Sequence, residues 1–278
     1  MTAAAPPVRA PRTSAGGWIA LLVVYVVWGS TYLGIRIGVG SIPPFVLAGT
    51  RYAIAGALLC VFGGRSRQGA RSLRSWTFWR SALVIGLLLL VGGNGLVTFG
   101  EQTVPSGIAS LLVATVPFWM ALFDAILRRR PIPGLVLAGV VIGLAGTALL
   151  VSPSASAGPP SVGSALVLLA AVCWAAGSLY SQRAPQAPDA LLGSGMEMLA
   201  GGVLLLLAAA FSGQIHPFPP AAGGLLALAW LTVFGSLVGF SAYGYALKAL
   251  PASTVSTYAF ANPIVAVLLG WGLLGETI

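Results

Sequence analysis

The stretch SLLVATVPFWMALF, residues 110–123, places Pro117 in the middle of an apolar run, and STYAFANPIVAVLL, residues 256–269, does the same with Pro263. Proline in a helix interior removes one backbone hydrogen bond and clashes with the preceding turn. The two prolines are 146 residues apart, in similar surroundings. A costly residue that recurs in this way predicts a duplicated unit, and it raises the question of which solvent surrounds these segments.

The composition predicts a protein that crosses a membrane many times. Of the 278 residues, 58% are hydrophobic and 7% are charged, and the mean hydropathy is +0.96. A soluble domain carries roughly 25% charged residues, so most of this surface must face lipid. A spanning helix needs about 20 largely apolar residues, and the long continuous runs argue against the short alternating strands of a β-barrel. We expect an all-α polytopic fold with nine spans, at residues 18–35, 44–63, 81–100, 107–127, 134–151, 163–181, 191–211, 225–246 and 252–274.

The net charge of +9 is explained by membrane orientation and requires no nucleic-acid partner. If the spans alternate in direction, twelve basic residues lie on one side of the membrane and only Arg36 lies on the other. This is the positive-inside pattern, and it predicts a cytoplasmic N-terminus. The basic residues assigned to the inner side are Arg9, Arg12, Arg65, Arg67, Arg71, Arg74, Arg80, Arg128, Arg129, Arg130, Arg183 and Lys248.

A single offset relates the two parts of the chain. The interval of 146 residues that joins the two prolines also carries Pro105 onto Pro251, and several rare landmarks agree with it. Such agreement predicts an internal repeat, although the overall identity between the two parts is low. The further matched pairs are Trp28 with Trp174, Gly93 with Gly239, Arg51 with Glu197, and Arg130 with Glu276.

Each predicted repeat unit holds five spans, and an odd number makes the second unit enter the membrane from the opposite side. Inverted repeats recur in transporters, where the binding site lies near the midplane between the units. We expect a disordered cytoplasmic tail at residues 1–17, a first unit at 18–151, a linker at 152–162 and a second unit at 163–278. The counterpart of the fifth span falls past residue 278, so we expect a ten-helix fold of two five-helix bundles, with the tenth helix truncated.

Aromatic and polar residues recur at helical spacing on the first, third, fourth, sixth, eighth and ninth spans, and they predict a substrate pathway. An aromatic lining with a few amides suits a small amphipathic solute. The candidate substrate-binding residues are Tyr25, Trp28, Tyr32, Asn94, Thr98, Trp119, Trp174, Ser178, Phe240, Tyr243, Tyr258 and Asn262.

These assignments have structural alternatives. Tyr32 lies near the end of its span, where tyrosine commonly anchors a helix at the membrane interface. Trp28, Trp174, Asn94 and Asn262 lie deeper, where an unpaired polar group is costly. Each of these four either completes a hydrogen bond between helices or contacts the solute.

The prolines and the fifth span support further expectations. Pro117 and Pro263 act either as hinges that expose a backbone carbonyl beside a cavity or as kinks that fit each helix to its neighbours. The fifth span carries a small-residue face, which predicts tight packing against another helix. That face holds Gly134, Ala138, Gly139, Gly143 and Gly146.

Two charged residues fall within predicted spans. Ionisable groups inside a membrane are candidates for a functional site, so Arg51 and Glu197 are possible pathway charges. The alternative is that each one caps a helix junction. Glu197 is the only deep carboxylate and therefore the only obvious proton carrier in the sequence.

The sequence argues against an enzyme. The single histidine, His216, lies in the predicted outer loop GQIHPFPP, so there is no histidine-rich metal motif, and no span carries paired carboxylates. No P-loop is present, and we expect neither a metal nor a cofactor. Cys60 and Cys173 fall within spans, where they are expected to be small packing residues.

Several motifs resemble the EamA-type exporters of the drug/metabolite transporter superfamily. These motifs are YVVWGSTYLGIR at residues 25–36, RYAIAGALL at 51–59, ILRRRP at 126–131 and LLGETI at 273–278. The resemblance implies ten helices in two inverted repeats, a bacterial inner-membrane location and the export of metabolites. The aromatic stripes are similar to those of the family's aromatic amino-acid exporters. The family's usual arginine in span two falls on Arg51, and its acidic residue after helix nine falls on Glu276, whereas RRR stands where a GE-like ending often closes helix four.

Charge content narrows the transporter class. A carrier of sugar phosphates needs several basic groups in its cavity, and only Arg51 is available here. A small cation antiporter needs a carboxylate on its first span, and none is present. We expect a secondary transporter that exports amino acids, including aromatic ones, by alternating access as a monomer or homodimer in the lipid bilayer. The alternatives are an exporter of purines, cationic drugs or other metabolites and, more remotely, a structural membrane protein.

Overall fold

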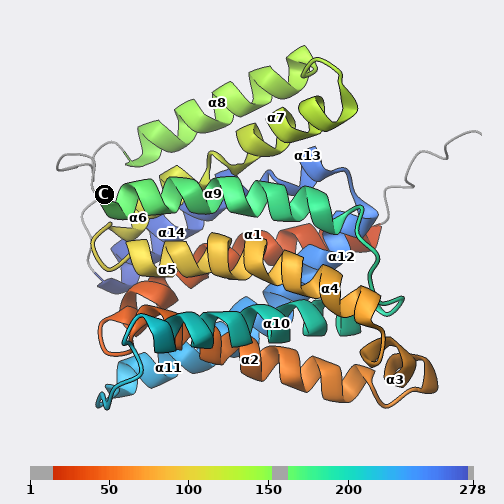
Figure 1. The fold of residues 1–278 in the computed structure, drawn as a ribbon. Coiled ribbons are helices and arrows are strands. Elements are labelled where there is room, and N and C mark those ends of the chain that lie inside the picture. The colour runs from red at the N-terminus through yellow and green to blue at the C-terminus, as the bar shows by residue number, and fades with distance from the viewer. Residues whose placement is uncertain (1–14, 152–161, 275–278) are drawn as a thin grey trace, which may run out of the picture.

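The computed structural model describes residues 15–151 and 162–274, and every regular element within those residues is a helix (Figure 1). Eight segments of the described chain are long and apolar enough to cross a membrane. The expectation of an all-α polytopic membrane protein is therefore confirmed. Most of the expected tail and linker lies outside the described residues, and the first helix begins at Ala15 rather than at residue 18.

The elements up to residue 151 correspond in position to the first five expected spans, but the fifth is not among the eight long segments, because its described apolar part is the shorter Gly134–Gly146. The third span is a continuous rod in which a π-helical segment, η1, joins two α-helical parts. This rod begins five residues earlier than expected, because the indole of Trp79 donates to the carbonyl oxygen of Leu73 at 2.8 Å and docks the rod onto a short preceding helix. The elements are α1 (Ala15–Val39), α2 (Pro44–Gly63), α3 (Arg67–Leu73), α4 (Trp76–Ile85), η1 (Gly86–Gly95), α5 (Leu96–Gly100), α6 (Ser106–Val113), α7 (Val116–Arg128) and α8 (Gly134–Val151).

The elements from residue 162 onward follow the same plan. The eighth span again contains a central π-helical segment, η3, which lies at almost the same place in the 146-residue register as η1. The elements are α9 (Val162–Ser181), α10 (Ala190–Phe211), α11 (Ala222–Trp230), η3 (Leu231–Phe240), α12 (Ser241–Ala249), α13 (Ala252–Val255) and α14 (Tyr258–Leu274).

The fourth and ninth spans are each interrupted, which the sequence analysis did not predict. Both begin directly after a proline, Pro105 or Pro251, and both break at a threonine, Thr115 or Thr257. The two threonine hydroxyls donate to the carbonyl oxygen three residues earlier, at 2.7 and 2.6 Å. The hydroxyl thus competes with the continuing helix for its carbonyl groups, and each span becomes a short helix followed by a longer one.

These interruptions change the interpretation of Pro117. It lies in the first turn of α7, where its missing N–H has no helical acceptor to lose. The expectation that Pro117 disrupts a helix interior is therefore wrong. Pro263 does lie inside α14, so the two prolines occupy different positions relative to the starts of their helices.

Glycines permit two matching close approaches between the predicted units. A Cβ at Gly93 of η1 would lie 2.6 Å from Cε3 of Trp174 on α9, and a Cβ at Gly239 of η3 would lie 2.5 Å from Nε1 of Trp28 on α1. The 146-residue offset exchanges one contact for the other. The helix pair α2 and α10 behaves alike, because Gly56 meets the backbone of Leu199 while Gly202 meets that of Ala53.

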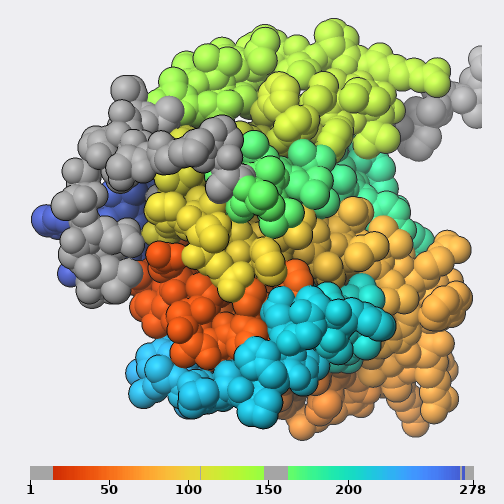
Figure 2. Space-filling model, turned by 60° about the vertical axis from the view of Figure 1, so that its left-hand side comes forward, coloured from red at the N-terminus to blue at the C-terminus, as the bar shows by residue number. Residues whose placement is uncertain are grey.

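The α8 helix lies at the edge of the molecule and not in a tightly packed interface. It runs beside α7 along the upper edge in Figure 1, and the same pair forms a ridge in Figure 2. A Cβ at Gly134, Gly139 or Gly146 would meet nothing within 4 Å, whereas one at Gly143 would meet the ring of Phe260. The expectation of tight packing along the whole small-residue face is therefore wrong for the described structure.

Candidate substrate-binding site

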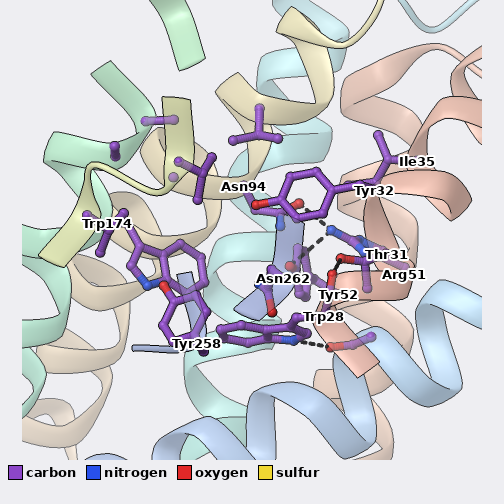
Figure 3. A pocket seen from close by; sticks show the side chains of 17 residues that line it. Trp28, Thr31, Tyr32, Ile35, Arg51, Tyr52, Asn94, Trp174, Tyr258 and Asn262 are labelled. Carbon is purple, nitrogen blue, oxygen red and sulfur yellow. Dashed lines mark hydrogen bonds between the residues drawn. The ribbon is translucent and has the colours of Figure 1, made fainter. Parts of the chain in front are cut away.

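A small cavity of about 50 Å³ lies between helices of both predicted units. Its walls come from α1, α2, η1, α5, α6, α7, α9, η3 and α14, so seven of the expected spans contribute to it. Figure 3 shows the indole of Trp174 and the ring of Tyr258 on one side, the guanidinium of Arg51 on the other, and Asn262 between them. A water needs about 10–15 Å³ on this measure, so the cavity has room for a few water molecules.

Four aromatic rings pack together at the apolar side of this site, and three of them line the cavity while Tyr243 lies behind it. Trp28 lies at their centre, with its ring centroid 5.3 Å from Trp174, 4.8 Å from Tyr243 and 5.2 Å from Tyr258. The contacts with Trp174 and Tyr258 are edge-to-face, the arrangement that the ring quadrupoles favour. We call these four side chains the aromatic cluster.

The polar atoms of the aromatic cluster are paired within the protein. The indole nitrogen of Trp28 donates to the carbonyl oxygen of Gly235 in η3 at 3.1 Å, and that of Trp174 donates to the hydroxyl of Tyr243 at 3.1 Å. The same hydroxyl lies 2.6 Å from Oγ of Ser178. Because their polar atoms are occupied, Trp28 and Trp174 present mainly their apolar faces to the cavity.

The opposite side of the cavity is built around Arg51. Its guanidinium lies 4.5 Å from the ring centroid of Tyr52, and its Nη2 donates to the Tyr52 hydroxyl at 3.1 Å and to Oδ1 of Asn94. Thr98 supports this arrangement, because its hydroxyl donates to the backbone carbonyl of Asn94 at 2.8 Å. Arg51 is 1% exposed, and it is the only charged residue that lines the small cavity in the described structure.

Asn262 connects the first turn of α14 to α1. In the orientation that satisfies its surroundings, its amide nitrogen donates to the carbonyl oxygens of Tyr258 at 3.1 Å and Tyr25 at 3.3 Å. The hydroxyl of Tyr25 also lies 2.5 Å from Oγ1 of Thr257. The start of α14 is therefore fastened to α1 through both backbone and side chains.

A second, much larger cavity of about 1540 Å³ lies on the other side of this fastening. It is lined by the first half of α1, by α7 and α8, and by the segments that follow α9 and α12. Its rim carries a small ion network in which Asp124 pairs with Arg128 at 2.8 Å and with Arg183 at 3.1 Å. The cavity also includes Arg130 and Lys248, so it lies at the basic end of the molecule.

The two cavities are separated by a thin wall, which we call the septum. At three places along the chain, one residue lines the small cavity while a residue one to three positions away lines the large one. The interruptions of the fourth and ninth spans fall at this level, because Thr115 directly precedes α7 and Thr257 directly precedes α14. The paired residues, with the small-cavity member first, are Trp28 and Tyr25, Val116 and Pro117, and Tyr258 and Thr257.

Comparison with known proteins places this architecture in a family. The model of the EamA-like transporter family matches residues 15–152 and 161–278. The chain belongs to the EamA-like transporter family. It is 41% identical over 265 residues to an uncharacterized inner membrane transporter of Escherichia coli K12, YedA, with 93% of this chain and 83% of the relative covered.

More distant relatives of this EamA-like protein are consistent with the family assignment and with the fold. An uncharacterized transporter of Bacillus subtilis, YvbV, is 24% identical over 268 residues and covers 96% of this chain and 86% of its own. A solved crystal structure matches with a TM-score of 0.73 at 22% identity, covering 95% of this chain and 89% of that one, which supports the fold alone. The protein is therefore a membrane transporter.

The EamA-like fold brings together about half of the predicted site residues. Seven of them line the small cavity: Trp28, Tyr32, Asn94, Trp174, Tyr258, Asn262 and the possible pathway charge Arg51. Three lie directly behind it, in contact with its walls: Thr98, Ser178 and Tyr243.

Other predicted residues lie elsewhere. Tyr25 and Pro117 line the large cavity, and Phe240 packs edge-on against Tyr52 behind the small one. Trp119 lies against Phe118 and Phe123 and lines neither cavity. Its indole nitrogen is buried without a partner among the described residues.

Glu197 and Pro263 also line neither cavity. Glu197 is 6% exposed on α10, within electrostatic reach of Tyr243 and Lys248 on α12. It therefore has no direct contact with either space through which a solute could pass. Among the described residues, no group of histidines, cysteines and carboxylates could hold a metal ion.

Several cavity residues were not predicted. Tyr52 directly follows the predicted Arg51, and Thr31 directly precedes the predicted Tyr32. Ala170 and Ala171 lie one turn before Trp174 on the same face of α9. Helical spacing from Trp174 would have found the two alanines. The second span was not expected to face the cavity, because it carries no stripe of polar residues apart from Arg51 and Tyr52.

Proposed function

We propose that this EamA-like protein is a secondary transporter that exports small amphipathic metabolites, amino acids including aromatic ones among them, across a bacterial inner membrane. The observation that carries this proposal is the two-sided small cavity. Aromatic rings line one side, a buried arginine with the amide of Asn94 lines the other, and Asn262 lies between them. Ligand sites are mostly apolar with a few placed polar groups, and this lining matches a solute with one ring and one polar end.

The proposal includes two inverted repeats and alternating access. A shift of 146 residues relates the glycine–tryptophan contact of Gly93 with Trp174 to that of Gly239 with Trp28, and this correspondence supports the inverted repeat. The positive-inside rule makes the basic end of the bundle cytoplasmic, so the large cavity faces the cytoplasm, where an exporter collects its solute. Because ligand pockets are typically about 300–1000 Å³, the small cavity of about 50 Å³ must enlarge, and opening of the septum supplies the space.

The test is counterflow uptake by purified protein in proteoliposomes preloaded with unlabelled amino acids. We expect labelled phenylalanine and tryptophan to accumulate more than threonine, because the aromatic cluster favours a ring. Trp28→Ala should reduce aromatic uptake at least about tenfold, because it removes the central ring of the aromatic cluster, and loss of an aromatic anchor commonly costs about 2 kcal/mol or more of binding. Trp271→Ala is the matched control, because Trp271 is 58% exposed on the outer face of α14.

The outcome of that test also decides between substrate classes. Uptake that requires a pH gradient would assign proton coupling and make Glu197→Gln the next variant. Failure to transport any amino acid by folded protein would reject this substrate class and leave purines, drugs and other metabolites as substrates. Equal losses in the Trp28 and Trp271 variants would show that the aromatic cluster does not form the binding site.

A further inference from the structure

The small cavity contains a buried positive charge, Arg51, for which the described residues show no ion pair. Arg51 is 1% exposed within a membrane-spanning helix. Both ion pairs that the described residues form belong to Asp124, at the rim of the large cavity. A cation inside a membrane is costly, and such groups usually pair with an anion or with backbone carbonyls. The position of Arg51 therefore calls for an anionic partner.

The hydrogen bonds of the guanidinium are also incomplete. A guanidinium offers five N–H donors. The described residues accept from Nη2 only, through Tyr52 and Asn94, and Nε is buried without a partner. Glu101 attracts the charge from the end of α5, but it does not line the cavity. The described residues thus leave part of the guanidinium's donor capacity unused beside the cavity that Arg51 lines.

From these observations we propose that Arg51 binds the carboxylate of the transported solute and that the cavity selects carboxylic acids over their uncharged or amine counterparts. This inference rests on the proposed function and specifies its substrate class. Arginine binds a carboxylate through two parallel hydrogen bonds, and the cavity already has the room of a few water molecules beside the guanidinium. The solute's apolar part then lies toward Trp174 and Tyr258, on the opposite side in Figure 3.

The complementary observation concerns amines. No carboxylate lines the small cavity in the described part of the chain, so an ammonium group finds only neutral partners there, namely amides, hydroxyl-bearing residues and aromatic rings. An amine without a carboxylate would place a second positive charge near Arg51. The cavity therefore disfavours cationic drugs, whereas a site built around an acidic residue would favour them.

The experiment measures ligand binding by the shift in the thermal unfolding midpoint of the purified protein in detergent. Three matched compounds are compared: L-phenylalanine, L-phenylalaninamide and 3-phenylpropionate. In the wild type both acids should bind about ten- to a hundredfold more tightly than the amide, as expected for hydrogen bonds to a charged group. Arg51→Gln should reduce this preference to less than about threefold, whereas Arg51→Lys should retain part of it because the charge remains but the planar fork does not.

Two further variants keep the test decisive. Asn94→Asp is nearly isosteric and places a permanent carboxylate on Nη2, so acid binding should be lost although the arginine remains. This variant decides the question if Arg51→Gln does not fold. Arg36→Gln is the control for charge, because Arg36 binds the carbonyl oxygen of Glu101 at 2.7 Å and does not line the cavity; its acid preference should equal that of the wild type.

The inference is overturned if the amide binds the wild type as tightly as the acid, if neither compound binds, or if Arg51→Gln and Asn94→Asp both keep the acid preference. Its failure is distinguishable from failure of the proposed function. Phenylalanine transport without acid preference would refute the role of Arg51 and leave the amino-acid transporter intact. Acid-selective binding without amino-acid transport would support the role of Arg51 and reject the amino-acid proposal.

Discussion

Replacement of Gly239 by alanine tests the contact on which the cavity wall depends. The added Cβ would lie 2.5 Å from Nε1 and 2.8 Å from Cδ1 of Trp28. Non-bonded carbon atoms prefer about 3.5–4.0 Å, so the indole must move by roughly 1 Å. It has little room to do so, because Trp174, Tyr243 and Tyr258 surround it at ring-centroid distances of 4.8–5.3 Å.

The expected magnitude follows from three contributions. Movement of the indole breaks its 3.1 Å hydrogen bond to Gly235, and a buried donor without a partner costs about 1–3 kcal/mol. Overpacking costs about 1–3 kcal/mol more, while alanine gains up to about 1 kcal/mol over glycine in a helix. We expect the free energy of unfolding to fall by about 2–4 kcal/mol, and aromatic solute uptake to fall with it.

The assay is equilibrium unfolding in mixed detergent micelles, followed by circular dichroism, together with counterflow uptake. Gly139→Ala is the control, because a Cβ at Gly139 meets nothing within 4 Å, and its stability should be unchanged or slightly higher. Gly93→Ala should behave like Gly239→Ala, since its Cβ would lie 2.6 Å from Trp174. If Gly239→Ala unfolds within about 0.5 kcal/mol of the wild type, a change no larger than a neutral surface substitution gives, the described contact is wrong. A large difference between Gly93→Ala and Gly239→Ala would contradict the inverted repeat.

Two further predictions concern the septum and the α7 helix. Tyr25→Phe removes the hydrogen bond to Thr257, which is worth about 0.5–1.5 kcal/mol. In this variant we expect a cysteine placed at Ala171 in the small cavity to react about two- to tenfold faster with a thiol reagent added from the basic end. An unchanged rate would show that this bond does not hold the septum closed. Trp119→Phe removes an indole nitrogen that is buried without a partner among the described residues and keeps an aromatic ring at this position. We expect the free energy of unfolding to stay the same or to rise by up to about 1 kcal/mol. A marked loss of stability would show that the nitrogen does have a partner.

The sequence predicts the spans well because one strong physical requirement, about 20 apolar residues per crossing, sets their length. It does not predict the interruptions of the fourth and ninth spans. Threonine is common inside membrane helices. Only the structure shows that the hydroxyls of Thr115 and Thr257 donate to backbone carbonyl oxygens three residues earlier. Pro117 lies close to the interruption of the fourth span but does not cause it by breaking a helix interior, since α6 ends at Val113 and Pro117 lies in the first turn of α7.

The candidate site was predictable where two independent signals coincided. Trp28 and Trp174 lie on helical stripes and also match under the 146-residue offset, and the structure places their rings 5.3 Å apart. Trp119 has no aromatic counterpart under that offset, since Val265 stands there, and it packs against neighbours on its own helix instead. Whether a deep aromatic faces a cavity depends on helix rotation, which a single stripe does not determine.

The matched contacts also bear on how binding is coupled to conformational change. Trp28 and Trp174 each line the small cavity, and each packs against a glycine of the other predicted unit. The proposed solute-binding surface is therefore also the surface along which the two predicted units meet. A ligand shifts a conformational equilibrium only through contacts that differ between the states, and here any rearrangement of the units changes the position of both indoles. A solute held between Arg51 and these rings would thus sense the relative position of the units directly, with no need for a separate relay such as Glu197.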